Sequence, residues 1–230
     1  MKTHQLLAAT FVLALAPSAA DAATIDFRGM GNAEIVTIYG LRGGSTGLRV
    51  WAGEMNWAWL DGKPDGASAT FYSYCVDIMN DERDPQYNVI VKSTDGLLTD
   101  SMTAGAAQKA VWLFDRYAAD AHASSGGALA AGLQLAIWEV LFDDGLSLTS
   151  GNFRVTGAST ATMNVATEYL NALAGTGTGY TTAANALWLD VPSGQGQDQI
   201  TKTVPEPATL VLFGTGMLGI AIRRRRVSQA

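Results

Sequence analysis

The sequence is poor in cysteine, histidine and charge. Among its 230 residues there are one cysteine, Cys75, and two histidines, His4 and His122, and only 16% of the residues are charged. A single cysteine cannot form an internal disulfide, and the few histidines offer no zinc-binding spacing. No phosphate-binding loop or dinucleotide fingerprint is present either. The sequence therefore predicts no metal and no cofactor, and the thiol of Cys75 is its most unusual group.

Basic residues are scarce in the central part of the chain. The whole sequence has 15 Lys and Arg against 21 Asp and Glu. Lys2 and residues 223–226 account for five of the basic residues, and Asp21 and Glu206 for two of the acidic ones, which leaves 10 against 19 in residues 23–203. This net charge of −9, without a basic run, excludes nucleic acid as a partner, because phosphate binding requires clustered Lys and Arg. It favours a soluble surface outside the cell.

The N-terminal end has the composition of a secretory signal peptide. Lys2 gives a basic start, residues 6–16 form an apolar run, and Ala20-Asp21-Ala22 is a small-x-small cleavage site. The apolar run is too short to span a bilayer comfortably, which distinguishes it from a membrane helix. We therefore predict that residues 1–22 form a signal helix, that cleavage follows Ala22, and that the protein is exported.

The C-terminal end contains a second targeting segment. Pro205, Glu206 and Pro207 precede an uncharged apolar stretch, 208–222, and a basic tail, 223–226. The tail consists of Arg223, Arg224, Arg225 and Arg226. We predict a single membrane helix over 208–222 with the arginines on the cytoplasmic side, as the positive-inside rule requires. The two prolines keep the segment before the helix extended and accessible to a processing enzyme.

This order of elements resembles the PEP-CTERM sorting signal of Gram-negative bacteria. The resemblance covers residues 204–230. It implies an exosortase as partner, a membrane enzyme that cleaves near the Pro-Glu-Pro. It also implies transient anchoring in the inner membrane and a final location in the cell envelope, at the cell surface or in the extracellular (biofilm) matrix. A plain C-terminal membrane anchor is the alternative.

Between the two ends, hydrophobic periodicity predicts strands, then helices, then a strand. The strand-rich part, 23–94, contains predicted strands at 33–39, 47–52, 69–77 and 87–92. The helical part, 102–173, contains predicted helices at 104–117, 128–142 and 160–173, and a closing strand is predicted at 186–191. This order is typical of an α+β body, here residues 23–192, followed by a polar linker over 193–203.

The two stronger helices each contain a Gln-x-Ala-x-Trp sequence, beginning at Gln108 and at Gln134. At about 100° per residue, Gln108 falls opposite the apolar face of its helix. Gln134 falls in the middle of an apolar stripe, from which Glu139 and Asp143 point away. A primary amide in that position must find hydrogen-bond partners or cost on the order of 1–3 kcal/mol. One interpretation is a core amide bonded to nearby backbone, and the other is a reactive partner for Cys75.

Cys75 lies on the predicted strand 69–77. Attack of its thiolate on the carboxamide carbon of Gln134, with loss of ammonia, would leave an internal thioester. Such a bond requires a site sheltered from water, because hydrolysis would otherwise discharge it. We expect Tyr74, Trp112 and Trp138 to supply the walls of that site.

The Tyr-Cys-Val-Asp sequence around Cys75, on a strand, and the Gln-x-Ala-Ile-Trp sequence from Gln134, on a later helix, resemble the Cys-Gln thioester domains of bacterial surface adhesins. The resemblance covers residues 72–142. It implies that Cys75 is the thioester cysteine and Gln134 the acyl donor, within a β-rich barrel or sandwich that carries a helical subdomain. It also implies that an amine on a surface or matrix target is captured as an isopeptide. This is single-turnover covalent adhesion, so we expect no enzyme activity.

Two other functions are open. The chain could be a passive structural protein of an exopolysaccharide or biofilm matrix, with Cys75 as a small buried hydrophobe. It could also be a cysteine hydrolase in which Cys75 acts with His122.

Two acidic turns raise the question of calcium. Asp77, Asp81, Glu82 and Asp84 crowd one turn, and Asp143-Asp144 begin another. Neither matches an EF-hand loop, so we interpret both as solvated acidic loops.

Overall fold

The computed structural model describes residues 21–40, 44–81, 85–93, 105–143, 145–177, 186–192 and 195–202. Ala20 of the predicted cleavage site and the whole predicted sorting signal, 204–230, lie outside the described residues. Ala22 lies in the first strand. In the part of the chain that is described, no helix is both long and apolar enough to span a membrane.

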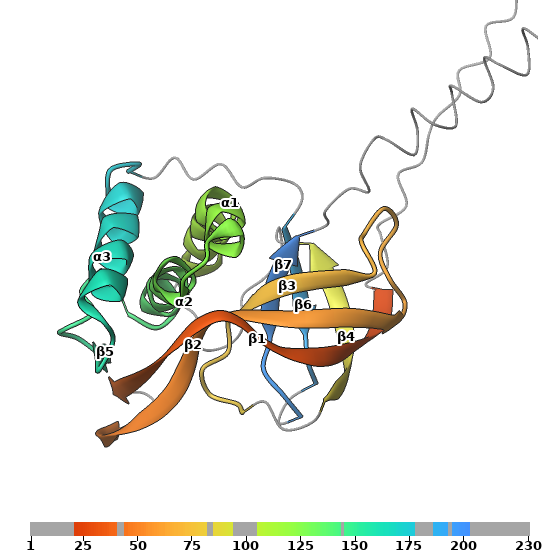
Figure 1. The fold of residues 1–230 in the computed structure, drawn as a ribbon, viewed down its shortest axis with the longest axis horizontal. Helices are drawn as coiled ribbons and strands as arrows, with labels where there is room; N and C mark the ends of the chain where they lie inside the picture. Colours follow the sequence, from red (N-terminus) through yellow and green to blue (C-terminus); the bar gives the residue numbers. More distant parts are fainter. Residues whose placement is uncertain are drawn as a thin grey trace, which may run out of the picture.

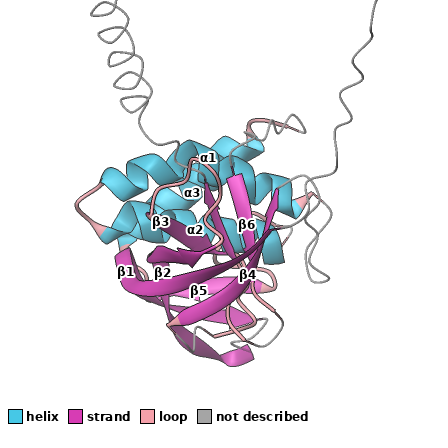
Figure 2. Ribbon diagram, turned by 90° about the vertical axis from the view of Figure 1, so that its right-hand side faces the viewer, coloured by secondary structure: helices cyan, strands magenta, loops and turns pink. Residues whose placement is uncertain are grey.

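In its described residues the body contains one seven-stranded sheet and three helices, which confirms the predicted α+β class (Figure 1). The strands are β1 (Asp21–Gly40), β2 (Gly44–Asp61), β3 (Thr70–Cys75), β4 (Gln86–Ser93), β5 (Phe153–Thr156), β6 (Ala186–Asp190) and β7 (Gln199–Lys202). The helices are α1 (Ala106–Ala123), α2 (Gly127–Phe142) and α3 (Thr160–Ala174). The helices gather on one side of the strands (Figure 2).

The sheet closes on itself. Its strand order is β2-β3-β7-β6-β4-β1-β5, and β1 also pairs with β2, so that the strands from β2 to β1 form a ring and β5 extends β1. Every pairing is antiparallel. The ring leaves few unpaired strand edges, which is the usual protection of a sheet against edge-to-edge association.

β1 and β2 form a long hairpin with two halves. Register shifts interrupt the pairing between Phe27 and Gly29 and between Met30 and Ala33. The half nearer the ring pairs with β4, and the half nearer the hairpin turn pairs with β5 beneath the helices (Figure 1). At the junction Gly53 has φ +144°, and a Cβ there would lie 2.4 Å from the carbonyl oxygen of Asn32. The sequence analysis predicted strands only in the half nearer the hairpin turn, at 33–39 and 47–52. In the other half, glycines interrupt the alternation of apolar and polar residues.

α2 and α3 agree closely with the predicted helices, whereas α1 continues to Ala123, six residues beyond the predicted end at 117. The environment of α2 also differs from the prediction. Every residue of α2 from Ala130 to Phe142 is buried, including Glu139, which is 0% exposed. The prediction that Glu139 points away from the apolar face toward solvent is therefore wrong. α2 packs against α1, α3 and the β1–β2 hairpin, so it has no face left for solvent.

Two strands have no counterpart in the sequence analysis, β5 and β7, each of four residues. β7 lies in the segment 193–203 that was expected to be a linker. It is instead part of the sheet, where it pairs with β3 and β6, and Gln199, Ile200 and Thr201 are buried. Such short segments, one of them half polar, carry too little alternation to be recognised as strands.

Candidate functional site

Cys75 is the last residue of β3 and is completely buried. The strand ends there because the chain turns at Asp77, whose carboxylate accepts a hydrogen bond from the main-chain N–H of Met79 (2.8 Å). The Cys75 thiol donates to the carbonyl oxygen of Asp77, with a Sγ–O distance of 3.2 Å. On the other side, the N–H of Val76 donates to the carbonyl oxygen of Asp198, just before β7 (2.9 Å). The position of the cysteine is thus fixed from two directions.

Gln134 extends from α2 to the main chain of Cys75. The N–H of Cys75 donates to Oε1 of Gln134 (3.0 Å), and Nε2 of Gln134 donates to the carbonyl oxygen of Cys75 (2.8 Å). Gln134 is 0% exposed, whereas Gln108, its counterpart in α1, is exposed. The structure therefore brings together the two residues that the sequence analysis paired, across 59 positions of the chain. The same two hydrogen bonds would also satisfy the side-chain amide of Gln134 if it were an ordinary, unreactive core residue.

Of the three aromatic residues expected around this pair, Tyr74 and Trp138 are buried. Tyr74 meets Phe114 edge-on, with ring centroids 6.0 Å apart, and burial raises the pKa of the Tyr74 phenol. Trp138 lies one helical turn beyond Gln134 and packs edge-on against Phe153 at 6.2 Å. Both belong to the same hydrophobic core as Cys75.

Trp112 has a different environment. It is only half-buried, and its ring contacts are with its own helix: Tyr117, with centroids 6.1 Å apart, and the guanidinium of Arg116, 5.5 Å from the ring centroid. Tyr117 in turn stacks on Tyr169 of α3 at 3.7 Å. Trp112 is therefore part of an aromatic cluster on the α1–α3 side.

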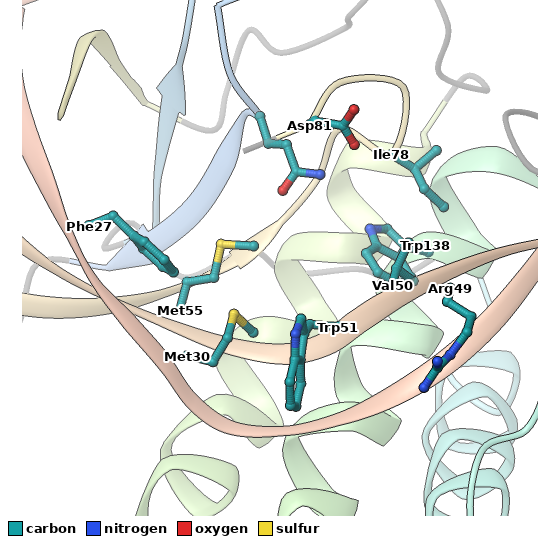
Figure 3. A pocket seen from close by; sticks show the side chains of 10 residues that line it. Phe27, Met30, Arg49, Val50, Trp51, Met55, Ile78, Asp81 and Trp138 are labelled. Carbon is teal, nitrogen blue, oxygen red and sulfur yellow. The ribbon is translucent and has the colours of Figure 1, made fainter. Parts of the chain in front are cut away.

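A cavity of about 350 Å³, which we call the hairpin cavity, is lined by residues of the β1–β2 hairpin together with Ile78 and Trp138, and not by Cys75 or Gln134 themselves. Figure 3 shows Met30, Met55 and Trp51 on its hairpin side, with Ile78 and Asp81 above them. Its lining also includes Trp138. Ile78 follows Cys75 by three residues and Trp138 follows Gln134 by one helical turn, so the lining includes residues close in sequence to both. Sequence reasoning did not identify Met30, Met55 or Trp51, because only the fold of the hairpin brings them here.

Two buried carboxyl groups lie on segments linked to the pair: Glu139 is in α2, as Gln134 is, and Asp198 directly precedes β7. Burial raises the pKa of Glu139 to about 7, although the N–H of Ser147 donates to its Oε1 (2.6 Å) and opposes the shift. Burial likewise raises the pKa of Asp198 to about 7, against the hydrogen bond from the N–H of Val191 (2.8 Å). The main chain of Asp198 also bonds to Val76. Both groups therefore titrate in the neutral range.

His122, which the hydrolase hypothesis pairs with Cys75, instead contacts Glu54 and Tyr72. Its Nδ1 lies 2.8 Å from Oε2 of Glu54, a carboxylate that is only 3% exposed. Its ring stacks on Tyr72, with centroids 4.3 Å apart and an interplanar angle of 15°. Burial, followed by the charge of Glu54, raises the pKa of Tyr72 to about 12. Glu54 was missed in the sequence because nothing local marks a residue that pairs 68 positions away.

The acidic turns show no metal-binding arrangement among the residues that the structure describes, where no group of three His, Cys, Asp or Glu side chains converges. Glu82, Asp84 and Asp144 lie outside these residues. The carboxylate of Asp143 accepts hydrogen bonds from the main-chain N–H groups of Gly145 (3.2 Å) and Phe153 (2.9 Å). It therefore serves to shape the loop between α2 and β5.

Comparison with known families identifies the C-terminal segment. Residues 203–226 match the model of the PEP-CTERM protein-sorting motif, which confirms the resemblance found in the sequence. The motif implies processing by an exosortase and an exported protein associated with the cell envelope of a Gram-negative bacterium. No curated protein matches the sequence.

Two solved structures are similar to the body. One is the N-terminal thioester domain of the fibronectin-binding protein SfbI from Streptococcus pyogenes, with 11% identity and a TM-score of 0.43, covering 85% of this chain and 100% of that one. The other is the N-terminal thioester domain of a surface protein from Clostridium perfringens, with 12% identity and a TM-score of 0.40, covering 74% of this chain and 100% of that one. The likeness concerns the course of the chain and not the chemistry of Cys75 and Gln134.

Proposed function

We propose that this exported protein is a covalent adhesin, in which Cys75 and Gln134 form an internal thioester that captures an amine on a surface or matrix target. The observation that carries the proposal is the pair of hydrogen bonds, 3.0 and 2.8 Å long, between the Gln134 carboxamide and the main chain of Cys75. They hold the electrophilic carbon next to the residue that bears the chain's one thiol.

Thioester formation requires a balanced acyl transfer. The thiol of Cys75 loses its proton, the thiolate attacks Cδ of Gln134, and the Cδ–Nε2 bond breaks so that ammonia leaves with that proton. Negative charge develops on Oε1 in the tetrahedral intermediate. The N–H of Cys75 already donates to this oxygen and is therefore placed to stabilise the charge.

Capture of the target is a second acyl transfer. An amine attacks the same carbon, the Cys75 sulfur leaves as a thiolate and takes up the proton of the amine, and an isopeptide remains at Gln134. The thioester must survive until then, and the complete burial of Cys75 and Gln134 supports this, because water is kept from the bond.

The hairpin cavity supplies a route for the amine. Its volume of about 350 Å³ lies at the small end of ligand-binding pockets. Met30, Met55 and Trp51 provide apolar surface for the aliphatic stem of a lysine side chain.

Intact mass tests the proposal. The purified protein should be lighter than its calculated mass by one ammonia and should gain one methylamine when incubated with that amine. Cys75→Ala should abolish both effects, and Gln108→Ala, the matched change in α1, should leave both intact. A protein of full mass whose thiol titrates after unfolding would refute the thioester.

The second candidate is a passive structural protein of the exopolysaccharide or biofilm matrix. One observation favours it: the same two hydrogen bonds leave neither end of the Gln134 amide unsatisfied, so the residue would also be stable as an ordinary core amide. The mass experiment separates the two functions, because only the adhesin loses ammonia.

A further inference from the structure

A second cavity lies at the beginning of β3, at the opposite end of the strand from Cys75. Its volume is about 520 Å³, and it shares no lining residue with the hairpin cavity. We call it the β3–α1 cavity, because residues of β3 and of the C-terminal part of α1 line it. Its volume is within the usual range for small-ligand sites, about 300–1,000 Å³.

The polar lining comes from elements that are distant in the sequence. Thr70 and Tyr72 lie two residues apart on β3 and so face the same side of the sheet. Asn56 of β2 is the register partner of Tyr72 and shares that side. Arg28 of β1, His122 of α1 and Lys202 of β7 complete the polar part of the lining, so the site exists only in the folded chain.

The composition of this cavity differs from that of the body around it. Its described lining includes Arg28, Lys202 and the histidine His122 but no carboxylate, whereas residues 23–203 carry 10 Lys and Arg and 19 Asp and Glu. The acidic partners lie behind the basic groups. Glu54 is 3% exposed and its partner His122 52%, and Asp26 is 14% exposed and its partner Arg28 55%. The less exposed carboxylates of Glu54 and Asp26 therefore orient His122 and Arg28, whose exposed N–H groups are available to a ligand.

An aromatic surface and neutral hydrogen-bonding groups accompany the cations. The Tyr72 and His122 rings are stacked at 4.3 Å with an angle of 15°, which fixes their orientation before any ligand binds. The Asn56 amide and the Thr70 hydroxyl can each donate and accept hydrogen bonds. A flat apolar ring, polar groups at its sides and exposed cations suit a ligand with an apolar face, several hydroxyls and an anionic group.

We propose that the β3–α1 cavity binds a saccharide that carries a carboxylate, such as a uronate unit of an acidic polysaccharide. The C–H face of the sugar ring packs on the Tyr72–His122 stack, and its hydroxyls bond to Asn56 and Thr70. Arg28 and Lys202 bind the carboxylate through charge-assisted hydrogen bonds. The acidic remainder of the body repels such a polymer, so that contact is confined to this cavity.

This site does not require the thioester. No residue of the β3–α1 cavity takes part in the chemistry proposed for Cys75 and Gln134. The saccharide provides a reversible, non-covalent contact, and its loss or retention is independent of amine capture.

Calorimetric titration of the purified protein with uronate trisaccharides tests the proposal. The probes are the trimers of glucuronate, mannuronate and galacturonate, each compared with its carboxyl-reduced neutral counterpart. We expect at least one uronate trimer to bind, and its reduced counterpart to bind at least tenfold more weakly. Lys202→Gln should weaken binding about fivefold to tenfold, while Lys109→Gln, the same charge change on α1 outside the cavity, should have no effect.

Two further variants separate the cavity from general effects. Tyr72→Leu removes the aromatic surface and should weaken uronate binding even though it leaves every charge in place. Cys75→Ala should bind the uronate as the wild type does, whatever the mass experiment shows. Absence of binding to all three uronates, equal binding of the neutral trimers, or equal effects of Lys202→Gln and Lys109→Gln would each overturn the proposal.

Discussion

The carboxamide of Gln134 pairs with the main chain of Cys75 as a neighbouring strand would, donating one hydrogen bond and accepting another. A side chain from a helix thus takes the place of a backbone partner at the end of β3. The orientation of the amide is fixed by this double contact, and the same contact bears on both stability and reactivity.

Removal of this pairing should destabilise the fold even where no thioester can form. In a Cys75→Ala background, we expect Gln134→Ala to lower the free energy of unfolding by about 2–4 kcal/mol, because it leaves a buried N–H and a buried C=O without a partner and opens a cavity. Urea unfolding measures the change. Gln108→Ala in the same background is the control and should stay within about 0.5 kcal/mol, since Gln108 is exposed. Equal losses for the two variants would contradict the structural role of Gln134.

The size of the hairpin cavity should control which amines are captured. Met30→Trp narrows the cavity and should slow the capture of a bulky amine, such as a biotinylated diamine, by roughly tenfold or more, while methylamine is affected less. The ammonia deficit of the unreacted protein should not change, since Cys75 and Gln134 are untouched. Met79→Trp is the control, because Met79 is 48% exposed and does not line the cavity. Time-resolved mass spectrometry gives the capture rates of both amines. If Met30→Trp left the ratio of these two rates unchanged, entry of the amine through the hairpin cavity would be excluded.

Stability should rise as the pH falls from 8 to 5.5. The pKa values of Glu139 and Asp198 are raised to about 7 in the folded protein, above the ordinary carboxyl value of about 4, so the folded state binds more protons between these values. The free energy of unfolding should therefore be greater at pH 5.5 than at pH 8, by about 2 kcal/mol for each carboxyl. Asp198→Asn should remove about half of this pH dependence in urea titrations. A dependence that persists unchanged in Asp198→Asn would show that Asp198 is not one of its sources.

Removal of the Ser73 hydroxyl and removal of the Tyr74 hydroxyl, both on β3, should have different effects on the free energy of unfolding. The Ser73 hydroxyl accepts from Nε1 of Trp57 (2.8 Å) and donates to Oε1 of Gln199 (2.9 Å), so Ser73→Ala should cost about 1–3 kcal/mol. The buried Tyr74 hydroxyl has no hydrogen-bond partner among the described residues, so Tyr74→Phe should be neutral or stabilising. Thermal and urea unfolding measure both. A greater loss in Tyr74→Phe than in Ser73→Ala would contradict these environments.

The sequence predicted the helices well because apolar residues recur at helical spacing over more than ten residues in each. It also paired Cys75 with Gln134, on chemical grounds that do not depend on knowing the fold. It did not reveal that Glu139 is buried, since a single helix pattern cannot show that α2 is enclosed on all sides. It likewise could not reveal Glu54 behind His122 or Lys202 beside Tyr72, because only the closed sheet brings these residues together.

The position of β7 has a mechanical consequence. β7 ends at Lys202, and the match to the sorting motif begins at residue 203, so the sheet and the motif follow each other directly along the chain. A pull on the motif would therefore load β7 directly and pass to β3 and β6 through main-chain hydrogen bonds. Because Gln199 of β7 is the register partner of Cys75, tension at the tail acts on the strand pairing that holds the cysteine in place.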